Sequence, residues 1–325
     1  MRAVSSAPPR RIAAKTVSRT EPAWIPLPRD GVSASRVAVG DSRFAHVLDF
    51  LRWRFPAVAD WPHRLAHGDV LDAAGRPVLA GAPCVVGEVL WYWRDPPPEP
   101  QVPFEIEVLH RDDHLVVVDK PHFLATLPGG RHLRETVLFR LRRQLGMQTL
   151  TPMHRLDRDT AGVLVFIVRP EDRHAYQSLL RERAVFKVYE AVAPWRPDVA
   201  LPVLCRNRIE EPPGRDFMQM RVVPGEPNAE TLIECLQTLP DGLALYRLTP
   251  HTGRKHQLRA QMNALGLPLV GDRVYPRLLP EPPPQAVADY AEPLQLLARE
   301  YGFTDPLSGE PRRFVSRRRL ALAPG

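Results

Sequence analysis

From residue 104 onward, hydrophobic and polar residues follow the periods expected of strands and helices. Apolar runs with strand periodicity alternate with segments whose apolar residues recur every three or four positions. This order predicts an α+β domain over residues 104–325, built on a mixed, mostly antiparallel sheet flanked by helices. We expect strands within 106–120, 163–168, 186–193, 229–239 and 243–250, and helices within 135–146, 171–182 and 255–266.

The residues before this domain have a different pattern. Residues 1–35 mix Pro, Arg, Ser and Ala without periodicity, which predicts a disordered or loosely draped arm. Residues 36–95 predict a small α/β module with helices within 43–55 and 61–66, followed by short strands. The proline-rich residues 96–103 predict a stiff linker between this module and the larger domain.

The charge balance is moderately basic, with 44 Lys and Arg against 37 Asp and Glu and a formal net charge of +7. This suits a polyanionic partner, but codon usage in a GC-rich genome is the better explanation of the abundance of arginine, so the charge supports nucleic-acid binding only weakly. The three cysteines are far apart in the sequence, and no stretch of about 20 apolar residues is present. We therefore expect a cytoplasmic protein with reduced thiols and no membrane segment.

Two charged segments stand out as candidates for chemistry. The first, HRLDRDTAG from His154 to Gly162, comes directly before the predicted buried strand. Loop residues held by a rigid strand are common sites of catalysis, although a turn whose carboxylates pair with its own arginines is an equally good interpretation of spacing alone. The second, TGRKHQLR, begins at Thr252, which is placed to cap the following helix. Its Arg254 is placed to reach Asp157, unless these charges simply face solvent.

These segments together resemble the RluA/RluD-type family of RNA pseudouridine synthases. The resemblance extends over about residues 104–280, because three further segments occur in the family's order: HLVVVDKP, FKVYEAV and ALGLPLVGDRVYP. It implies an isomerase that converts uridine to pseudouridine in structured ribosomal or transfer RNA, with no metal and no organic cofactor. We also expect the protein to be a monomer.

The resemblance implies roles for individual residues. Asp157 matches the catalytic carboxylate, and Arg254 matches the arginine that keeps this carboxylate charged through an ion pair. Tyr189 matches the tyrosine that packs against the target base, although an ordinary strand tyrosine is the alternative. Because the target uridine must leave its stack to be modified, Arg155 is the candidate for filling the vacated space.

Three further residues are assigned to substrate and RNA binding: His154, Lys255 and Gln257, with His154 bracing the loop rather than performing chemistry. The chain also departs from the family pattern. Ala161 replaces a serine, and Leu297 stands where a histidine is usual. The module at residues 36–95 resembles in outline the small S-four RNA-binding domain, but it has fewer basic residues than usual.

Two other functions remain open at this stage. One is a non-catalytic RNA-binding or ribosome-assembly protein on the same fold, against which the joint presence of Asp157, Tyr189 and Arg254 argues. The other is a metal-dependent hydrolase that would use His154, Asp157, His251 and His256 as ligands. Such a site requires these side chains to converge closely on one point.

Overall fold

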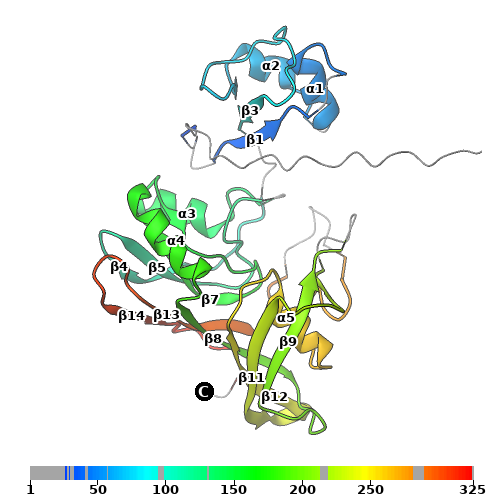
Figure 1. Cartoon of the computed structure of the whole chain (residues 1–325), viewed down its shortest axis with the longest axis vertical. Coiled ribbons are helices and arrows are strands. Elements are labelled where there is room, and N and C mark those ends of the chain that lie inside the picture. Colours follow the sequence, from blue (N-terminus) through cyan, green and yellow to red (C-terminus); the bar gives the residue numbers. More distant parts are fainter. Residues whose placement is uncertain are drawn as a thin grey trace, which may run out of the picture. The chain divides into compact units, whose positions relative to one another are not determined.

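The polypeptide divides into two units at the boundary between Arg94 and Asp95 (Figure 1). The computed structural model describes residues 26–27, 29, 33–40, 43–56, 58–93, 99–129, 132–212, 219–280 and 289–323. Most of the predicted arm at residues 1–35 and the first residues of the predicted linker therefore lie outside the described residues.

The N-terminal unit combines two short helices with a three-stranded antiparallel sheet in the order β1-β3-β2. Its core follows from the apolar spacing of the first helix, whose Val47, Phe50 and Leu51 are buried together with Trp61 and Leu65 of the second. The elements are β1 Ser35–Ala38, α1 Val47–Arg54, α2 Trp61–Ala66, β2 Val70–Leu71 and β3 Val89–Tyr92. The S-four identity of this unit stays a prediction.

The larger unit is built on an eleven-stranded sheet, and the predicted α+β class with a mostly antiparallel sheet is confirmed. Its path is β10-β9-β11-β12-β8-β13-β7-β5-β4, with β14 paired to β13 and β6 to β7; only the β13–β7 pair is parallel. The strands are β4 Glu107–Arg111, β5 Leu115–Lys120, β6 Thr151–Pro152, β7 Ala161–Ile167, β8 Val185–Pro194, β9 Val203–Glu210, β10 Arg221–Val223, β11 Ala229–Leu239, β12 Leu243–Pro250, β13 Leu296–Thr304 and β14 Pro311–Val315.

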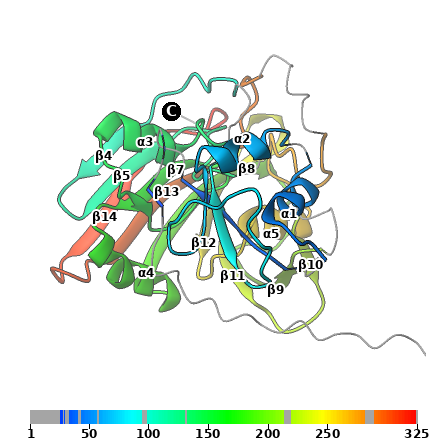
Figure 2. The same ribbon diagram turned by 90° about the horizontal axis from the view of Figure 1, so that it is seen from above.

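Helices cover both faces of this sheet, so strands β5 and β7 are buried at every position. Helix α3 (Val137–Leu145) packs on the face that carries Val116 and Leu164, and α4 (Arg173–Arg181) packs on the opposite face, which carries Val117 and Val165. Figure 2 shows α3 and α4 on opposite sides of these strands. Helix α5 (Gln257–Ala264) packs against β8, β11 and β12.

Local sequence signals account for several of these boundaries. The Thr136 hydroxyl accepts a hydrogen bond from the Phe139 N–H at the start of α3, and Gly146 ends that helix with φ 68°. The β11–β12 hairpin closes through a short 3₁₀ turn, Pro240–Gly242, as its turn residues predict. A second 3₁₀ turn, Pro170–Asp172, leads into α4.

Gly162 fixes the position of the last strands relative to β7. Its φ is +112°, and a Cβ atom at this position would lie 2.2 Å from the Ala298 carbonyl oxygen, so any side chain would force β7 and β13 apart. Strand β13 lies between β7 and β8, and Leu297, which occupies the position of the family histidine, is fully buried in the core. The segment beyond residue 280, where the sequence resemblance weakens, is therefore central to the sheet.

Candidate active site

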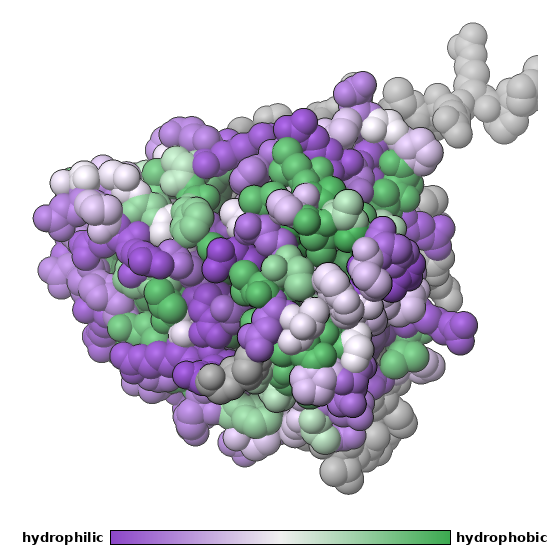
Figure 3. Space-filling view, turned by 90° about the horizontal axis from the view of Figure 1, so that it is seen from below, coloured by the Kyte–Doolittle hydropathy of each residue, from purple (hydrophilic) through white to green (hydrophobic). Residues whose placement is uncertain are grey.

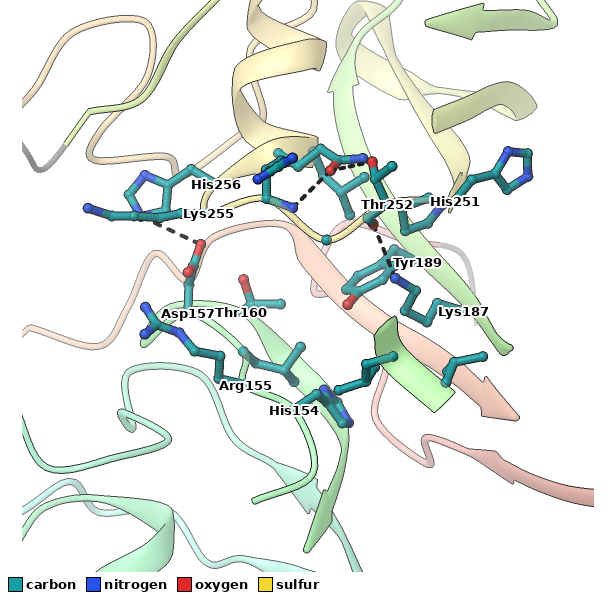
Figure 4. A pocket seen from close by; sticks show the side chains of 18 of the residues that line it. His154, Arg155, Asp157, Thr160, Lys187, Tyr189, His251, Thr252, Lys255 and His256 are labelled. Carbon is teal, nitrogen blue, oxygen red and sulfur yellow. Dashed lines mark hydrogen bonds and ion pairs between the residues drawn. The ribbon is translucent and has the colours of Figure 1, made fainter. Parts of the chain in front are cut away.

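The two charged segments and β8 enclose one cavity of about 570 Å³. The loop between β6 and β7 supplies one wall, the loop between β12 and α5 supplies the facing wall, and β8 forms the floor (Figure 4). The charged and polar lining residues are His154, Arg155, Asp157, Thr160, Arg181, Arg183, Lys187, Tyr189, Asn228, His251, Thr252, Arg254, Lys255, His256, Gln257 and Arg259. Of the sequence-predicted site residues, the structure brings all seven to this cavity.

Asp157 lies at the base of the cavity with its side chain 23% exposed. Its Oδ2 atom accepts a hydrogen bond from Arg259 Nη1 at 3.2 Å and lies 3.8 Å from His256 Nε2. The Arg259 side chain is only 3% exposed and donates two further hydrogen bonds, of 2.6 and 2.8 Å, to the carboxylate of Asp272. Arg259 is therefore held in place independently of Asp157.

These neighbours keep Asp157 negatively charged. Burial on its own would raise the pKa of this carboxyl, but the charges of His256 and Arg259 and the Arg259 hydrogen bond outweigh burial, so the pKa is lowered. A carboxylate that is ionised yet largely withdrawn from water is suited to react with, or stabilise charge on, a bound ligand.

Arg254 does not form the expected ion pair with Asp157, which pairs with Arg259 instead. The Arg254 Nε atom donates instead to the Asn228 carbonyl oxygen at 3.2 Å. Helical geometry explains the difference: α5 begins immediately after His256, so Arg259 lies one turn inside the helix on the same side as His256. Arg254 precedes the helix and is exposed. Thr252 likewise does not cap α5, whose N-cap residue is His256.

His256 enters the site through an unusual backbone conformation. Its φ is 52°, in the left-handed region, and its side chain is 9% exposed. The ring lies edge-on to Tyr275, 6.0 Å between centroids, and among the described residues its Nδ1 atom has no hydrogen-bond partner. Burial lowers the pKa of His256 while Asp157 acts in the opposite direction.

Tyr189 projects from the floor strand toward Asp157 (Figure 4). Burial and the Asp157 charge raise the pKa of the phenol, so it is neutral at physiological pH. Within the described part of the chain the phenol oxygen has no hydrogen-bond partner, although a tyrosine hydroxyl in a core usually finds one. The ring thus offers the cavity both an apolar face and an unused hydroxyl.

The loop that carries Asp157 is held by buried polar groups. The fully buried Lys120 ammonium donates hydrogen bonds to the carbonyls of Pro121, Leu124 and Arg158, at 2.7–2.9 Å. The Thr126 hydroxyl donates to the Leu156 carbonyl and accepts from its N–H. Burial lowers the pKa of Lys120 to about 7, against the attraction of nearby carboxylates.

His154 and Gln257 are committed to the scaffold. The His154 ring stacks on Tyr301 at 4.2 Å, and its Nε2 atom accepts from the Val165 N–H at 3.3 Å. Gln257 is 4% exposed. Its amide oxygen accepts hydrogen bonds from the Thr252 hydroxyl and the Arg254 N–H, and its amide nitrogen donates to the Glu230 carbonyl and the Thr231 hydroxyl of β11. Both ends of the amide have hydrogen-bond partners, so Gln257 braces the loop, and its assignment to RNA binding stays a prediction.

Replacing His154 by alanine is expected to lower the free energy of unfolding by about 2–4 kcal/mol, because a stacked ring and a hydrogen bond to β7 are lost. Urea unfolding measures this, with the exposed His174→Ala as a matched control. Burial lowers the pKa of His154 from 6.5 to about 3. The neutral ring therefore stabilises the fold fully above pH 6.5, and this stabilisation is lost as the pH falls from 6.5 toward 3.

The four side chains of the alternative metal site do not converge. His154 is stacked on Tyr301, and His251 bonds the Glu230 carboxylate at 2.7 Å, so only His256 approaches Asp157. Across the described ranges, no group of three or more His, Cys, Asp or Glu side chains is placed to share a metal ion. The hydrolase arrangement is thus not supported by the geometry.

Sequence reasoning missed Arg259 and Asp272 as the pair that supports the catalytic carboxylate, and it did not single out Lys187. The signal for Arg259 was its spacing of three from His256 on the predicted helix, which places both on one side. The signal for Lys187 was its spacing of two from Tyr189 on the predicted strand, which places both on one face.

Comparisons with known proteins identify the family of this chain. Residues 114–264 match the RNA pseudouridylate synthase family. The chain is 34% identical to an uncharacterized RNA pseudouridine synthase of Synechocystis sp., over 70% of this chain and 79% of the relative. It is 33% identical to the dual-specificity RNA pseudouridine synthase RluA of Haemophilus influenzae, over 68% and 94%.

Among solved structures, human RNA pseudouridylate synthase domain containing 1 superposes with a TM-score of 0.53 at 22% identity, covering 68% of this chain and 86% of that one, which shows the shared fold. Within the described residues, no helix is both long and apolar enough to cross a membrane. With its ordered motifs, its sheet and its close relatives in sequence, the chain belongs to the RluA-type family of RNA pseudouridine synthases.

Proposed function

We propose that this enzyme isomerises uridine to pseudouridine in ribosomal or transfer RNA, with Asp157 as the catalytic carboxylate. The observation that carries the assignment is the ion pair between Asp157 and the buried Arg259 at the base of a cavity floored by Tyr189. The Haemophilus influenzae relative is a dual-specificity RNA pseudouridine synthase, which supports more than one kind of RNA as a candidate substrate.

The chemistry conserves all atoms of the substrate. The bond between N1 of the uracil and C1′ of the ribose breaks, the base turns, and a bond forms between C5 and C1′. The C5 proton leaves, and N1 gains a proton, so nothing is consumed. Asp157, ionised and desolvated, acts at C1′ or assists the cleavage. Tyr189 packs against the base and retains it while it turns.

The cavity requires the target uridine to leave its stack. The Asp157 side chain is only 23% exposed, so a base held in a duplex does not reach it. Arg155 lies beside Asp157 and is exposed, and it has no ion-pair partner among the described residues. We assign it to the space that the extruded nucleotide vacates, and we assign the rim residues Arg254 and Lys255 to contacts with RNA phosphates.

The N-terminal unit offers a second surface for the RNA. The guanidinium of Arg43, which precedes α1, lies 4.5 Å from the ring centre of Trp53 on that helix, and Trp53 is 50% exposed. A cation over an exposed aromatic ring is suited to stack on an unpaired base. We propose that this unit contributes RNA affinity, in agreement with its S-four outline.

The proposal also covers the oligomeric state of the enzyme and its location in the cell. We propose that the monomer is active, which light scattering of the active enzyme tests. A cytoplasmic location stays a prediction, which fractionation of cells expressing the tagged protein tests.

Mapping of pseudouridine in total RNA tests the proposed reaction directly. We expect one or a few uridines in ribosomal or transfer RNA to lose the modification when the gene is deleted. The modification should return when the wild-type gene is supplied and not when Asp157→Asn is supplied. An unchanged map in the deleted strain would overturn the proposal.

RNA binding is expected to weaken as salt rises, because phosphate contacts release counterions. With about four contacts to a single-stranded segment, log K should fall with log salt with a slope of roughly −3. Filter binding at several salt concentrations measures the slope. A flat response would contradict an extended electrostatic contact with RNA.

A further inference from the structure

The cavity extends along β8 beyond the catalytic residues. Side chains two positions apart on a strand lie on one face, so Tyr189, Lys187 and Val185 follow one another along the cavity floor. Arg183, at the end of the α4–β8 turn, continues this line outward. We call this extension the β8 arm and define it by Arg181, Arg183, Val185, Lys187 and His251. Figure 4 shows Lys187 on the far side of Tyr189 from Asp157.

The cavity has a large excess of positive charge. Seven Lys or Arg side chains line it, and Asp157 is its single acidic residue. Asp157 is already paired with Arg259, so the cations of the β8 arm have no anion inside the cavity. Elsewhere many arginines are paired, as Arg196 is with Asp198 and Arg313 is with Glu300.

Lys187 is the clearest case of a cation without an anionic partner in the cavity. Its ammonium donates to the Thr252 carbonyl at 3.1 Å and, among the described residues, faces no carboxylate. Burial lowers the pKa of Lys187, which shows that the surroundings do not compensate its charge. An ammonium has three donors, so two remain for a ligand. A partly buried cation of this kind is stabilised when an anion binds.

The outer end of the arm presents a second such cation. Arg183 is exposed and has no ion-pair partner in the described part of the chain. Its φ is 57°, a left-handed conformation that is unfavourable for a residue with a Cβ atom. Between the two cations, Val185 contributes an apolar surface of the kind that a ribose or a base covers.

We propose that the β8 arm binds the nucleotide next to the target uridine, as a single-stranded segment. Lys187 contacts the phosphate nearer the target, Arg183 contacts the next phosphate outward, and Val185 packs against the sugar or base between them. This rests on the proposed function and adds a specific claim: the enzyme requires an unpaired neighbour on one side of the uridine, because a duplex partner strand has no space in the cavity.

The test uses an RNA oligonucleotide containing the uridine identified by mapping. Affinity is measured in the Asp157→Asn background, because this variant does not convert the substrate. Asp157→Asn is tested alone and combined with Lys187→Met, Lys187→Arg or Arg183→Gln. Lys187→Met and Arg183→Gln should each weaken binding about tenfold and reduce the salt slope by about 0.7. Lys187→Arg should retain most of the affinity, and the exposed Arg111→Gln, outside the cavity, serves as the control.

Neutral methylphosphonate linkages placed one at a time around the uridine locate the contact. For Asp157→Asn alone, one linkage adjacent to the target should weaken binding about tenfold, and with Lys187→Met the same linkage should have no further effect. Equal losses at every linkage with and without Lys187→Met would overturn the assignment. If the wild-type enzyme modifies the RNA but these substitutions and linkages leave the affinity unchanged, the role assigned to the β8 arm is wrong and the proposed function stands. If the wild-type enzyme modifies no RNA, the proposed function itself fails.

Discussion

Asp157→Asn is expected to reduce pseudouridine formation by at least about 10³-fold in kcat while leaving the enzyme folded and able to bind RNA. The amide has nearly the same shape as the carboxylate but carries no charge, so it neither reacts at C1′ nor stabilises positive charge there. Arg259 keeps its two hydrogen bonds to Asp272, so the cavity retains its form. Single-turnover assays with excess enzyme measure the loss.

The matched control for this change is Asp198→Asn. Asp198 also pairs with an arginine, Arg196, but it lies on the surface with its side chain 62% exposed. We expect unchanged turnover, because surface ion pairs contribute little. Full activity of Asp157→Asn would show that the carboxylate is not required and would favour a non-catalytic role for this segment.

Arg259→Gln is expected to be the most destabilising single change at the site, by about 3–5 kcal/mol, because it leaves the carboxylates of Asp157 and Asp272 without their partner. The Asp272 side chain is fully buried, so its charge has no access to water. Urea unfolding measures the loss. Arg254→Gln, the residue expected from sequence to fill this role, should change stability by less than about 0.5 kcal/mol.

Arg259→Gln should also shift the pH dependence of catalysis. Arg259 helps to lower the pKa of Asp157, so its removal raises that pKa. The carboxylate is then ionised only at higher pH, and the acid limb of the rate profile shifts upward. In the wild type, the ion pair stabilises the fold fully when the pH lies above the pKa that Asp157 has in the unfolded chain. This stabilisation is lost as the pH falls through the lowered pKa that Asp157 has in the folded protein. An unshifted acid limb would show that another cation controls Asp157.

Much of the fold follows from periodicity that is local in sequence. The helix at residues 137–145 and the hairpin of β11 and β12 carry their own start, stop and turn signals, so they were predicted near their observed bounds. Strand β13 was not predicted, since its place depends on a parallel contact with β7 more than 130 residues away in sequence. Such long-range pairing leaves no local pattern.

The site was predictable in its residue types but not in its pairing. Asp157 and the TGRKHQLR segment were recognised from their sequence context, and both line the cavity. Whether Arg254 or Arg259 meets Asp157 depends on where α5 starts, and that start is set by the left-handed backbone of His256. A shift of one residue in a helix rotates each side chain by about 100°, which a motif does not encode.

Strand β13 also determines whether the site can be separated from the C-terminal part of the sheet. The Asp157 loop leads into β7, and Tyr189 lies on β8, and among the described strands these two are joined through β13, residues 296–304. A chain truncated before residue 296 therefore loses the site itself rather than a peripheral segment.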